Sequence, residues 1–448
     1  MGAERGRGPW AGRRLHFVGV GGAGMSGLAL IAVALGASVS GSDRSDSPYL
    51  QPLRDAGVVP ALGHAAANVP PGAQVVYSTA IDPANPERTA GLPEHGGGGV
   101  LHRSELLAEI AGRKRCLAVS GAAGKTTTSA MIVHILQSCG MDPAYVVGGE
   151  LVDTGRNAGW GTGDWIVVEA DESDRSLLNY VPEIAVLTNS ELDHHSTYRS
   201  RLDLEATFAT FLARAKVAVV WDRPGLLELA RGAAEATAYD IQQPRLDRTG
   251  ASFQWHGIDV WVPMPGHHNA LNAAGALTAS VAAGAEPAAA AAALADFHGV
   301  KRRMQLLGRH ASGAQIYDDY AHHPMKVQAA LAAARTLQPA RLVVVFQPHL
   351  FSRTKALASE FGRALAPADL CCVTDVYPAR ENHADFPGVD GRLVAAAAAD
   401  AGGAVAWMPR LDDAARWLDG TLREGDLCVV MGAGNIDSLG RALVGAQS

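Results

Sequence analysis

Short apolar runs alternate along this chain with longer segments whose apolar residues recur at helical spacing. Runs of this kind, bounded by glycine-rich or polar turns, are typical of strands buried in a parallel sheet, and the longer segments are typical of covering helices. The predicted strands occupy residues 15–20, a stretch ending near Asp43, and residues 74–78, 116–120, 165–169, 184–188, 217–221, 314–318, 342–346, 370–375 and 427–431. The order of strands and helices therefore predicts the α/β class.

The predicted helices follow the strands. They run from the first glycine-rich turn to about Gly36, and over about 104–111, 125–139 and 355–365, with another after the strand at 314–318. An alanine-rich segment ending near Phe297 contains Gly275, Gly284 and Pro287, so we expect two helices there instead of one. Residues 252–262, just before it, have the pattern of a β-hairpin.

The series of strands and helices divides into units at 15–112, 113–307 and 308–448, preceded by a basic, glycine-rich tail at 1–14 that we expect to be disordered. A length of 448 residues agrees with roughly three domains. Hydrophobic residues make up 48% and charged residues 19% of the chain, which indicates a globular protein. No fixed short repeat is visible, so a solenoid is excluded.

Charge and cysteine usage narrow the function further. The net charge of −7 argues against broad binding to a nucleic-acid backbone, so an anionic ligand must be held locally. The five cysteines form no C-x-x-C pair, which disfavours a disulfide framework or a zinc knuckle and favours the reducing cytoplasm. The sequence contains no signal-peptide pattern and no apolar run of about 18 to 20 residues, so we expect no membrane partner.

The first glycine-rich turn, residues 19–27, has the spacing G-x-G-x-x-G between a predicted strand and a predicted helix. Asp43 lies about 20 residues further on, at the end of the second strand. Small residues let the backbone approach a diphosphate, the helix N-terminus supplies free N–H groups, and the acid can take a ribose or a neighbouring donor. The turn predicts a site for a nucleotide diphosphate, and by itself it indicates NAD. A tight turn without a ligand is the alternative.

The second glycine-rich turn also joins a strand to a helix, and it reads Gly121-Ala122-Ala123-Gly124-Lys125-Thr126-Thr127. In a phosphate-binding loop the backbone amides cradle the phosphates, Lys125 would reach the β and γ oxygens, and the Thr126 hydroxyl would ligate Mg²⁺. Val119 stands where the general pattern has its first glycine, so the loop is short by that standard. A capped helix is the alternative interpretation.

Two acidic clusters, at 169–174 and 189–195, follow predicted strands. Carboxylates beyond strand ends, on the same edge as a phosphate loop, suit a hard cation with oxygen ligands such as Mg²⁺. The histidine pairs at 194/195, 267/268 and 322/323 have neither zinc-site spacing nor a nearby cysteine, so zinc is disfavoured.

Several longer motifs follow one another in a fixed order. They are Gly-Gly-Ala-Gly-Met-Ser-Gly at 21–27, Gly-Lys-Thr-Thr-Thr at 124–128, Glu-Ala-Asp-Glu-Ser-Asp at 169–174, Thr188-Asn189 with Asp193-His194, His268-Asn269-Ala270-Leu271-Asn272, Arg302-Arg303, Asp318-Asp319-Tyr320 with His322-His323-Pro324, Gln347-Pro348-His349 with Ser352-Arg353-Thr354, and Gly432-Ala433-Gly434-Asn435-Ile436. In this order the chain resembles the Mur ligases over about residues 15–440, and most closely those members that join L-alanine to UDP-N-acetylmuramate.

The resemblance implies a three-domain Mur ligase architecture. A Rossmann-like N-terminal domain (15–112) would bind the UDP-sugar, a P-loop ATPase-like central domain (113–307) would bind ATP, and a Rossmann-like C-terminal domain (308–448) would bind the amino acid. The implied reaction is ATP- and Mg²⁺-dependent ligation of L-alanine to the carboxylate of UDP-N-acetylmuramate through an acyl phosphate, in cytoplasmic synthesis of peptidoglycan precursors. The implied enzyme is a monomer or homodimer. The first turn then holds UDP and needs no nicotinamide, because a diphosphate presents the same groups in either ligand.

The resemblance also assigns roles to single residues. The UDP-sugar is assigned to Gly21, Gly22, Ala23, Gly24, Met25, Ser26, Asp43 and Ser78. ATP is assigned to Gly121, Ala122, Ala123, Gly124, Lys125, Thr126 and Thr127, with Asn272 at the adenine, Asp319 at the ribose and Arg303 at the transferring phosphate. The metal is assigned to Thr126, Glu169 and His194, and the amino acid to Tyr320, His322 and Arg353. Lys125, Glu169, His194 and Arg303 are the implied catalytic residues.

Two departures from the family pattern keep alternatives open. Ala122 and Ala123 stand where the family usually has Thr and then His or Asn, and Leu350 stands where some members have Arg. A nucleotide-binding protein with impaired turnover is therefore one alternative. A ligase that attaches a preformed tripeptide to the same sugar nucleotide is a second alternative. The stretch Gly299-Val300-Lys301-Arg302-Arg303 would suit it, whereas the clusters at 169–174 and 193–195 favour the alanine enzyme. An NAD oxidoreductase is a poor third because it leaves the Gly-Lys-Thr loop without a role.

Overall fold

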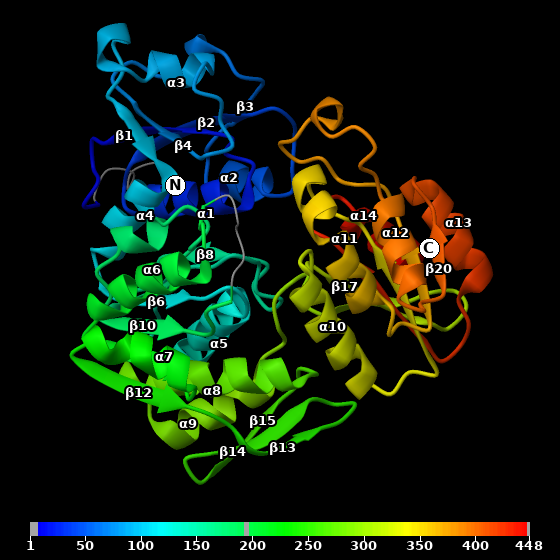
Figure 1. Cartoon of the computed structure of the whole chain (residues 1–448). Helices are drawn as coiled ribbons and strands as arrows, with labels where there is room; N and C mark the ends of the chain where they lie inside the picture. Colours follow the sequence, from blue (N-terminus) through cyan, green and yellow to red (C-terminus); the bar gives the residue numbers. More distant parts are fainter. Residues whose placement is uncertain (1–7, 192–196, 446–448) are drawn as a thin grey trace. The chain divides into compact units, whose positions relative to one another are not determined.

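The computed structural model describes residues 8–191 and 197–445, in two compact units (Figure 1). The first unit contains the chain up to Asp240 and residues Leu271–Phe297, and the second contains Ile241–Ala270 and the chain from His298 onward. No helix in these residues has the length and apolar character needed to cross a membrane. The α/β class is confirmed.

The N-terminal sheet of the first unit has five parallel strands in the order β3-β2-β1-β4-β5. Its strands are β1 (Arg14–Val18), β2 (Ser38–Asp43), β3 (Ala61–Leu62), β4 (Gln74–Tyr77) and β5 (Val100–His102). Its helices are α1 (Ala23–Ala34), α2 (Leu50–Asp55), α3 (Pro86–Ala90) and α4 (Arg103–Ala111). The strand order reverses at β1, and ligands of such sheets bind beyond the carboxyl end of the strand where this happens.

The central sheet of the same unit has the order β12-β11-β10-β6-β9-β7-β8, and only β8 is antiparallel to its neighbour. Its strands are β6 (Arg115–Ser120), β7 (Ala144–Val146), β8 (Ala158–Gly159), β9 (Trp165–Glu169), β10 (Ile184–Leu187), β11 (Val217–Trp221) and β12 (Glu235–Tyr239). Its helices are α5 (Lys125–Ser138), α6 (Arg201–Ala213), α7 (Pro224–Leu229), α8 (His267–Ala282) and α9 (Pro287–Ala293). The alanine-rich segment therefore forms two helices, as predicted; α8 begins in the second unit.

The two sheets of the first unit share one continuous apolar core. It extends from Leu15 and Phe17 on β1 to Phe208 and Phe211 on α6. Helix α1 lies directly against β8 (Figure 1). The turns at the ends of both sheets are therefore carried by one compact unit with a shared core, and such close-packed interiors transmit displacement.

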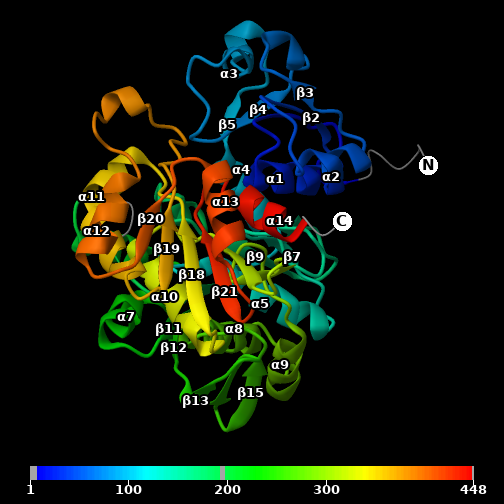
Figure 2. The ribbon, with the colours of Figure 1, turned by 90° about the vertical axis from the view of Figure 1, so that its right-hand side faces the viewer.

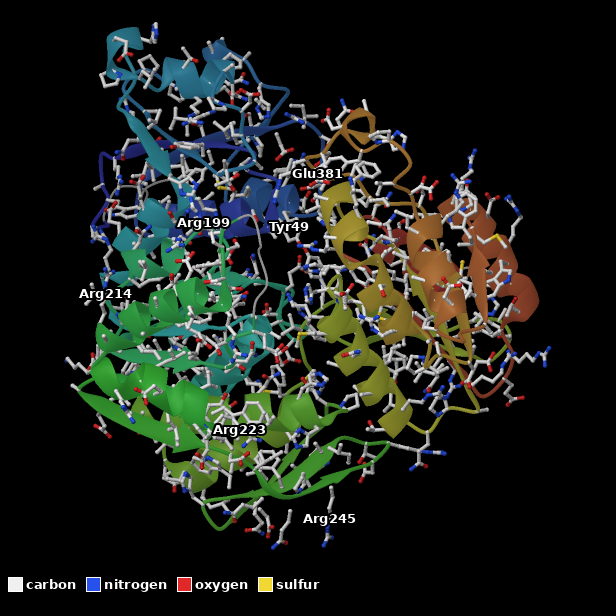
Figure 3. The ribbon with its side chains drawn as sticks, in the orientation of Figure 1. Tyr49, Arg199, Arg214, Arg223, Arg245 and Glu381 are labelled. Atoms are coloured by element: carbon white, nitrogen blue, oxygen red, sulfur yellow. The ribbon has the colours of Figure 1, made fainter. Side chains whose placement is uncertain are left out.

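Two features at the ends of this unit add to the sequence analysis. Residues 8–13 are folded, whereas the sequence predicted a disordered tail. Trp10 is buried, and its backbone N–H donates to the carbonyl of Leu35. At the other end, Arg223 (labelled in Figure 3) covers the ring of Trp221, whose indole N–H donates to Asp240 (3.1 Å). These contacts fix the last strands of the central sheet where the chain leaves the unit.

The second unit contains two sheets. A three-stranded antiparallel sheet consists of β13 (Gln242–Leu246), β14 (Ala251–Trp255) and β15 (Ile258–Val262). A six-stranded sheet has the order β16-β17-β21-β18-β19-β20, with strands β16 (Gln305–Arg309), β17 (Gln315–Asp319), β18 (Arg341–Phe346), β19 (Leu370–Val373), β20 (Val405–Trp407) and β21 (Asp426–Met431). Figure 2 shows β20, β19, β18 and β21 next to one another. The predicted hairpin at 252–262 is confirmed as β14 and β15.

Helices cover both faces of the six-stranded sheet. They are α10 (Pro324–Thr336), α11 (Phe351–Leu365), α12 (Arg392–Asp400), α13 (Leu411–Thr421) and α14 (Asp437–Gly445). Alternate residues of β18 enter two separate apolar clusters, with Val344 and Phe346 in one and Val343 and Val345 in the other. A sheet buried on both faces explains why its strands read as unbroken apolar runs.

A buried carboxylate ties the N-terminal sheet to its loops. Glu87 on α3 is fully buried and accepts hydrogen bonds from the Ser42 hydroxyl, the Asn68 amide (2.6 Å) and the Ala65 N–H (3.2 Å). His16 lies 3.5 Å from the same carboxylate. Burial raises the pKa of Glu87, but the hydrogen bonds outweigh it and lower the pKa from 4.5 to about 2.

We expect ionised Glu87 to contribute about 3 kcal/mol of pH-dependent stability to the first unit at pH 7, which is the shift converted at about 1.4 kcal/mol per pKa unit, and Glu87→Gln to remove this contribution. A lowered pKa stabilises the fold fully above pH 4.5, and this contribution is lost as the pH falls toward 2. Urea denaturation of the full chain as a function of pH measures it. The exposed Glu94→Gln is the control; equal stability of the two variants would contradict this role of Glu87.

Candidate active site

The first glycine-rich turn follows β1, at the point where the strand order reverses. The N–H groups of Gly19 and Val20 donate to the Ser42 carbonyl (2.8 and 2.9 Å), and the N–H of Gly21 donates to Oδ2 of Asp43 (2.8 Å). A Cβ on Gly21 would lie 2.9 Å from that carboxylate oxygen, so a larger residue would displace the Asp43 side chain. Asp43 thus fixes the shape of the turn from the neighbouring strand.

The other residues predicted at the sugar nucleotide divide into backbone and core. Gly22 precedes α1 and Ala23 and Gly24 begin it, so their N–H groups lie at the helix N-terminus. Met25 and Ser26 are buried within α1, and the Ser26 hydroxyl donates to the Ala23 carbonyl (3.0 Å). Their side chains therefore pack the turn. Ser78 follows β4 at the same sheet edge and is half-buried.

Arg103 lies beside this turn, and the sequence analysis missed it. A Cβ on Gly24 would lie 3.6 Å from Nη1 of Arg103 at the start of α4. The signal that could have found it is its place directly before the predicted helix at 104–111, because the preceding strand, β5, is too short to predict. A guanidinium beside exposed backbone amides suits a diphosphate.

The second glycine-rich turn follows β6, where the order of the central sheet reverses in the same way. Gly121 (φ +133°) and Gly124 (φ +85°) adopt left-handed conformations, and a Cβ on Gly121 would lie 2.1 Å from the Thr188 hydroxyl. The loop is held from β10: Asn189 binds both the N–H (3.1 Å) and the carbonyl (2.8 Å) of Ala123, and the Thr188 hydroxyl donates to the same carbonyl (2.6 Å). The backbone shape thus depends on neighbours outside the loop.

Lys125 is the first residue of α5, and its ammonium group points into a cluster of acceptors. It donates to both oxygens of Glu172 (2.9 and 2.7 Å) and to the Gly121 carbonyl (2.7 Å). Burial lowers the pKa of Lys125, but the carboxylates of Glu172, Asp171 and Glu169 outweigh it and keep the pKa above its usual value. The side chains of Lys125 and Glu172 are 13% and 1% exposed, so most of this ion pair lies out of water. The sequence analysis quoted Glu172 in the acidic cluster but gave it no role.

Glu169 ends β9 and lies within reach of the phosphate loop. The Thr126 hydroxyl donates to its Oε1 (3.2 Å), and the N–H of Gly148 donates to its Oε2 (2.7 Å). Among the described residues no group of three His, Cys, Asp or Glu side chains could hold a metal ion. A carboxylate beside a hydroxyl still fits Mg²⁺, which takes few protein ligands and completes its shell with water and phosphate. His194 lies outside the described residues.

Asn272 and Thr127 complete the environment of this loop. A Cβ on Gly124 would lie 2.4 Å from Oδ1 of Asn272 on α8, so this side chain lies against the loop. Thr127 is buried in the first turn of α5, and Ala122 is buried as well. The structure thus brings together the residues predicted at ATP that belong to the first unit.

In the second unit, Asp319 ends β17 and is buried. Its carboxylate accepts the N–H groups of Ala321 (2.8 Å) and Met304 (2.8 Å). The guanidinium groups of Arg302 and Arg303 lie 5.0 and 5.3 Å from the ring centroid of Tyr320. Asp319, Arg303 and Tyr320, which the sequence assigned to two ligands, therefore form one cluster.

Two of the residues predicted at the amino acid, His322 and Arg353, have His349 as a neighbour, and the third, Tyr320, lies beside His322. The rings of Tyr320 and His322 are 5.2 Å apart, those of His322 and His349 are 6.0 Å apart, and Tyr377 stacks on His349 at 5.7 Å. Nη1 of Arg353 lies 3.4 Å from Nδ1 of His349. Burial and the nearby Arg353 lower the pKa of His349 to about 4, so its ring is neutral at pH 7.

Leu350, the departure noted in the sequence, follows this histidine. It is buried and has φ +72°, a conformation that costs a non-glycine residue about 1 to 3 kcal/mol. Its N–H donates to the Tyr377 carbonyl (3.0 Å). The strained backbone therefore joins the start of α11 to the segment that carries Tyr377. The sequence analysis did not identify Tyr377 as a residue of this site.

Comparison with known proteins agrees with this geometry. Residues 14–115 match the family model described as Mur ligase family, catalytic domain; residues 119–280 match the Mur ligase middle domain, and residues 302–434 match the Mur ligase, glutamate ligase domain. This chain is a member of the Mur ligase family.

Individual relatives are similar over almost their whole length. A UDP-N-acetylmuramate–L-alanine ligase of Streptomyces griseus is 42% identical over 96% of this chain and 97% of its own. The crystal structure of a UDP-N-acetylmuramate–alanine ligase from Thermotoga maritima has a TM-score of 0.83 at 26% identity and covers 97% of this chain and 98% of that one. A murein peptide ligase from Psychrobacter arcticus, at 24% identity and a TM-score of 0.71 over 97% and 98% of the chains, shares the fold.

We expect Gly148→Ala to displace the Glu169 carboxylate of this Mur ligase, because the added Cβ would lie 2.4 Å from Oε2. Loss of such a positioning contact usually weakens metal binding about 10- to 100-fold. Calorimetric titration with a non-hydrolysable ATP analogue should show the weakening with Mg²⁺ and little change without it. Gly225→Ala, whose Cβ would meet nothing within 4 Å, is the control; equal affinities would contradict the assignment.

Proposed function

We propose that this Mur ligase joins L-alanine to the carboxylate of UDP-N-acetylmuramate at the expense of ATP, a step in the synthesis of peptidoglycan precursors. The observation that supports it best is the pair of phosphate-binding turns in one compact unit. The first ends in backbone amides with Arg103 beside them, and the second leads into Lys125 and Thr126, with Glu169 of β9 beside it. An oxidoreductase would need only the first. The full-length relatives with this activity agree with the proposal.

The reaction requires two anions to meet. A muramoyl carboxylate oxygen attacks the γ-phosphorus of ATP, and the bond from that phosphorus to the bridging oxygen breaks. The products of this step are ADP, which departs, and an acyl phosphate. The amine of L-alanine then attacks the acyl carbon, phosphate leaves with its electron pair, and the nitrogen loses a proton. Positive charge at the γ-phosphate lowers the barrier to the first step because it offsets the repulsion.

Lys125 supplies part of that charge, and its partners must change when ATP binds. In this structure its ammonium is satisfied by Glu172 and the Gly121 carbonyl. Thr126 and Glu169 would hold Mg²⁺, which supplies further positive charge on the phosphates when it is bound. Asn272, Asp319 and Arg303 keep their proposed roles at the adenine, the ribose and the transferring phosphate.

The amino acid is proposed to bind at Tyr320, His322 and Arg353. The ring of His349 is neutral at pH 7, and the guanidinium of Arg353 beside it suits the carboxylate of alanine. The buried Leu350 supplies no second cation. Mg²⁺ as the metal, a cytoplasmic location and a monomeric or homodimeric state stay predictions.

One observation argues against the alternative of a ligase with impaired turnover. The backbone at Ala123 is held by Thr188 and Asn189, so alanine at 122 and 123 keeps the shape of the loop without polar side chains. The Ala123 N–H must exchange Asn189 for phosphate when ATP binds. The tripeptide ligase differs only in the amino substrate, so a direct assay separates it.

The deciding assay incubates the chain with UDP-N-acetylmuramate, Mg·ATP and L-alanine, glycine, L-serine or a tripeptide, and measures phosphate release and product mass. We expect the mass of the alanine adduct. Lys125→Ala should reduce the rate at least about 100-fold, because it removes charge from the transferring phosphate, whereas the exposed Lys216→Ala should not. A tripeptide adduct alone would identify the chain as a tripeptide ligase. No turnover by the unaltered chain would favour the nucleotide-binding protein with impaired turnover.

UDP-N-acetylmuramate should raise the melting temperature of the full chain, and NADH should not, because only a ligand of the native state stabilises it. Arg103→Ala should reduce this shift, since it removes the guanidinium beside Gly24. Arg14→Ala serves as the matched control, because Arg14 is exposed and begins β1 at the opposite edge of the same sheet. Stabilisation by NADH alone would overturn the assignment of the first turn.

A further inference from the structure

A short hairpin of the central sheet connects the two phosphate-binding turns of the first unit. It consists of β7 and β8, and at its far end the side chain of Asn157 reaches the start of α1. The Asn157 amide donates to the Ala23 carbonyl (2.8 Å), which belongs to the first residue of the helix that follows the first turn. Asn157 is 6% exposed, so this hydrogen bond is shielded from water.

The other side of the hairpin holds the carboxylate of Glu169. The N–H of Val147 donates to the Asn157 carbonyl (2.9 Å), and the next residue, Gly148, donates its N–H to Oε2 of Glu169 (2.7 Å). Strand β7 also pairs with β9, the strand that ends in Glu169. A continuous path of hydrogen bonds therefore runs from the first turn to the carboxylate beside Thr126.

Close packing leaves this path little freedom. A Cβ on Gly27 of α1 would lie 2.7 Å from the Cβ of Ala158, and one on Gly148 would lie 2.4 Å from Glu169. A shift of α1 therefore has to be taken up by the hairpin, and a shift of the hairpin changes the donor on Glu169, because packed interiors deform little.

We propose that Asn157 is a positioning residue that couples occupancy of the sugar-nucleotide turn to the placement of Glu169 at the ATP site. The inference rests on the proposed function, because it takes the first turn as the site of UDP-N-acetylmuramate and Glu169 as a residue of the Mg·ATP site. Asn157 touches neither ligand. It acts through Ala23 on one side and through Val147 and Gly148 on the other.

The test measures coupling, not activity. The Kd of a magnesium-bound, non-hydrolysable ATP analogue is measured by calorimetry with and without saturating UDP-N-acetylmuramate. For the unaltered chain we expect the two values to differ by about fivefold or more, the usual lower range for coupled sites. Asn157→Ala should reduce the difference to less than about twofold, while each ligand alone binds within about threefold of its usual affinity.

Asn179→Ala is the matched control. The Asn179 amide also donates across the boundary between the two sheets, to the Ser104 hydroxyl (3.2 Å), but this hydrogen bond joins the 3-10 turn at 176–179 to α4 and not α1 to the hairpin. This variant should keep the coupling of the unaltered chain. Gly27→Ala, which pushes the hairpin from α1 without removing a polar group, provides a second variant and should lose the coupling as Asn157→Ala does.

The outcomes separate this inference from the proposed function. If the unaltered chain binds both ligands but shows no coupling, or if Asn157→Ala and Gly27→Ala keep it, the inference is wrong and the proposed function stands. Loss of coupling in Asn179→Ala to the same degree would also overturn it, because any contact between the sheets would then suffice. If the unaltered chain binds neither ligand, both proposals fail.

Discussion

The buried charge of Lys125 is the constraint on which the ATP site depends. An ammonium group taken out of water must be balanced, and Glu172, with Asp171 and Glu169 nearby, does this from the end of β9. This arrangement holds the lysine at the mouth of the loop before ATP arrives. A triphosphate can then replace one set of acceptor oxygens by another, so the charge does not have to be buried again.

Both glycine-rich turns of the first unit have the same position relative to their sheets. Each follows the strand at which the order of a parallel sheet reverses, and each places the N-terminus of a helix at that edge. Each turn is also held by the neighbouring strand, through Asp43 in one case and through Thr188 and Asn189 in the other. Because one apolar core supports both sheets, the two turns keep a fixed relation within the unit.

The charged groups of the second unit are arranged differently. Its carboxylate Asp319 and its cations Arg302 and Arg303 gather around Tyr320, while the neighbouring His349 is kept neutral by burial and by Arg353. Strain at Leu350 is tolerated because its N–H is hydrogen-bonded to the segment that carries Tyr377. Charge in this cluster is thus concentrated on the arginines.

The sequence by itself determined the α/β class, the long buried strands and both glycine-rich turns. Strands such as β6 and β18 are apolar runs closed by glycine or polar residues, and a turn that needs φ above zero is recorded directly as Gly121 or Gly124. Strands of two or three residues, such as β3 and β8, and the polar β13 escaped prediction because they have too little apolar periodicity to be read. Trp10 likewise seemed part of a free tail, since nothing local indicates that it packs near Leu35.

Only the tertiary structure decided which side chains act on which. Strand order and crossing helices bring three sets of side chains and backbone groups together. Glu172 balances Lys125, Gly148 and Asn157 lie between Glu169 and Ala23, and Arg103 lies beside Gly24. These partners are separated by tens of residues in sequence. Local propensity and spacing carry no information about such pairs, because the register of the sheets and the packing of the shared core bring them together.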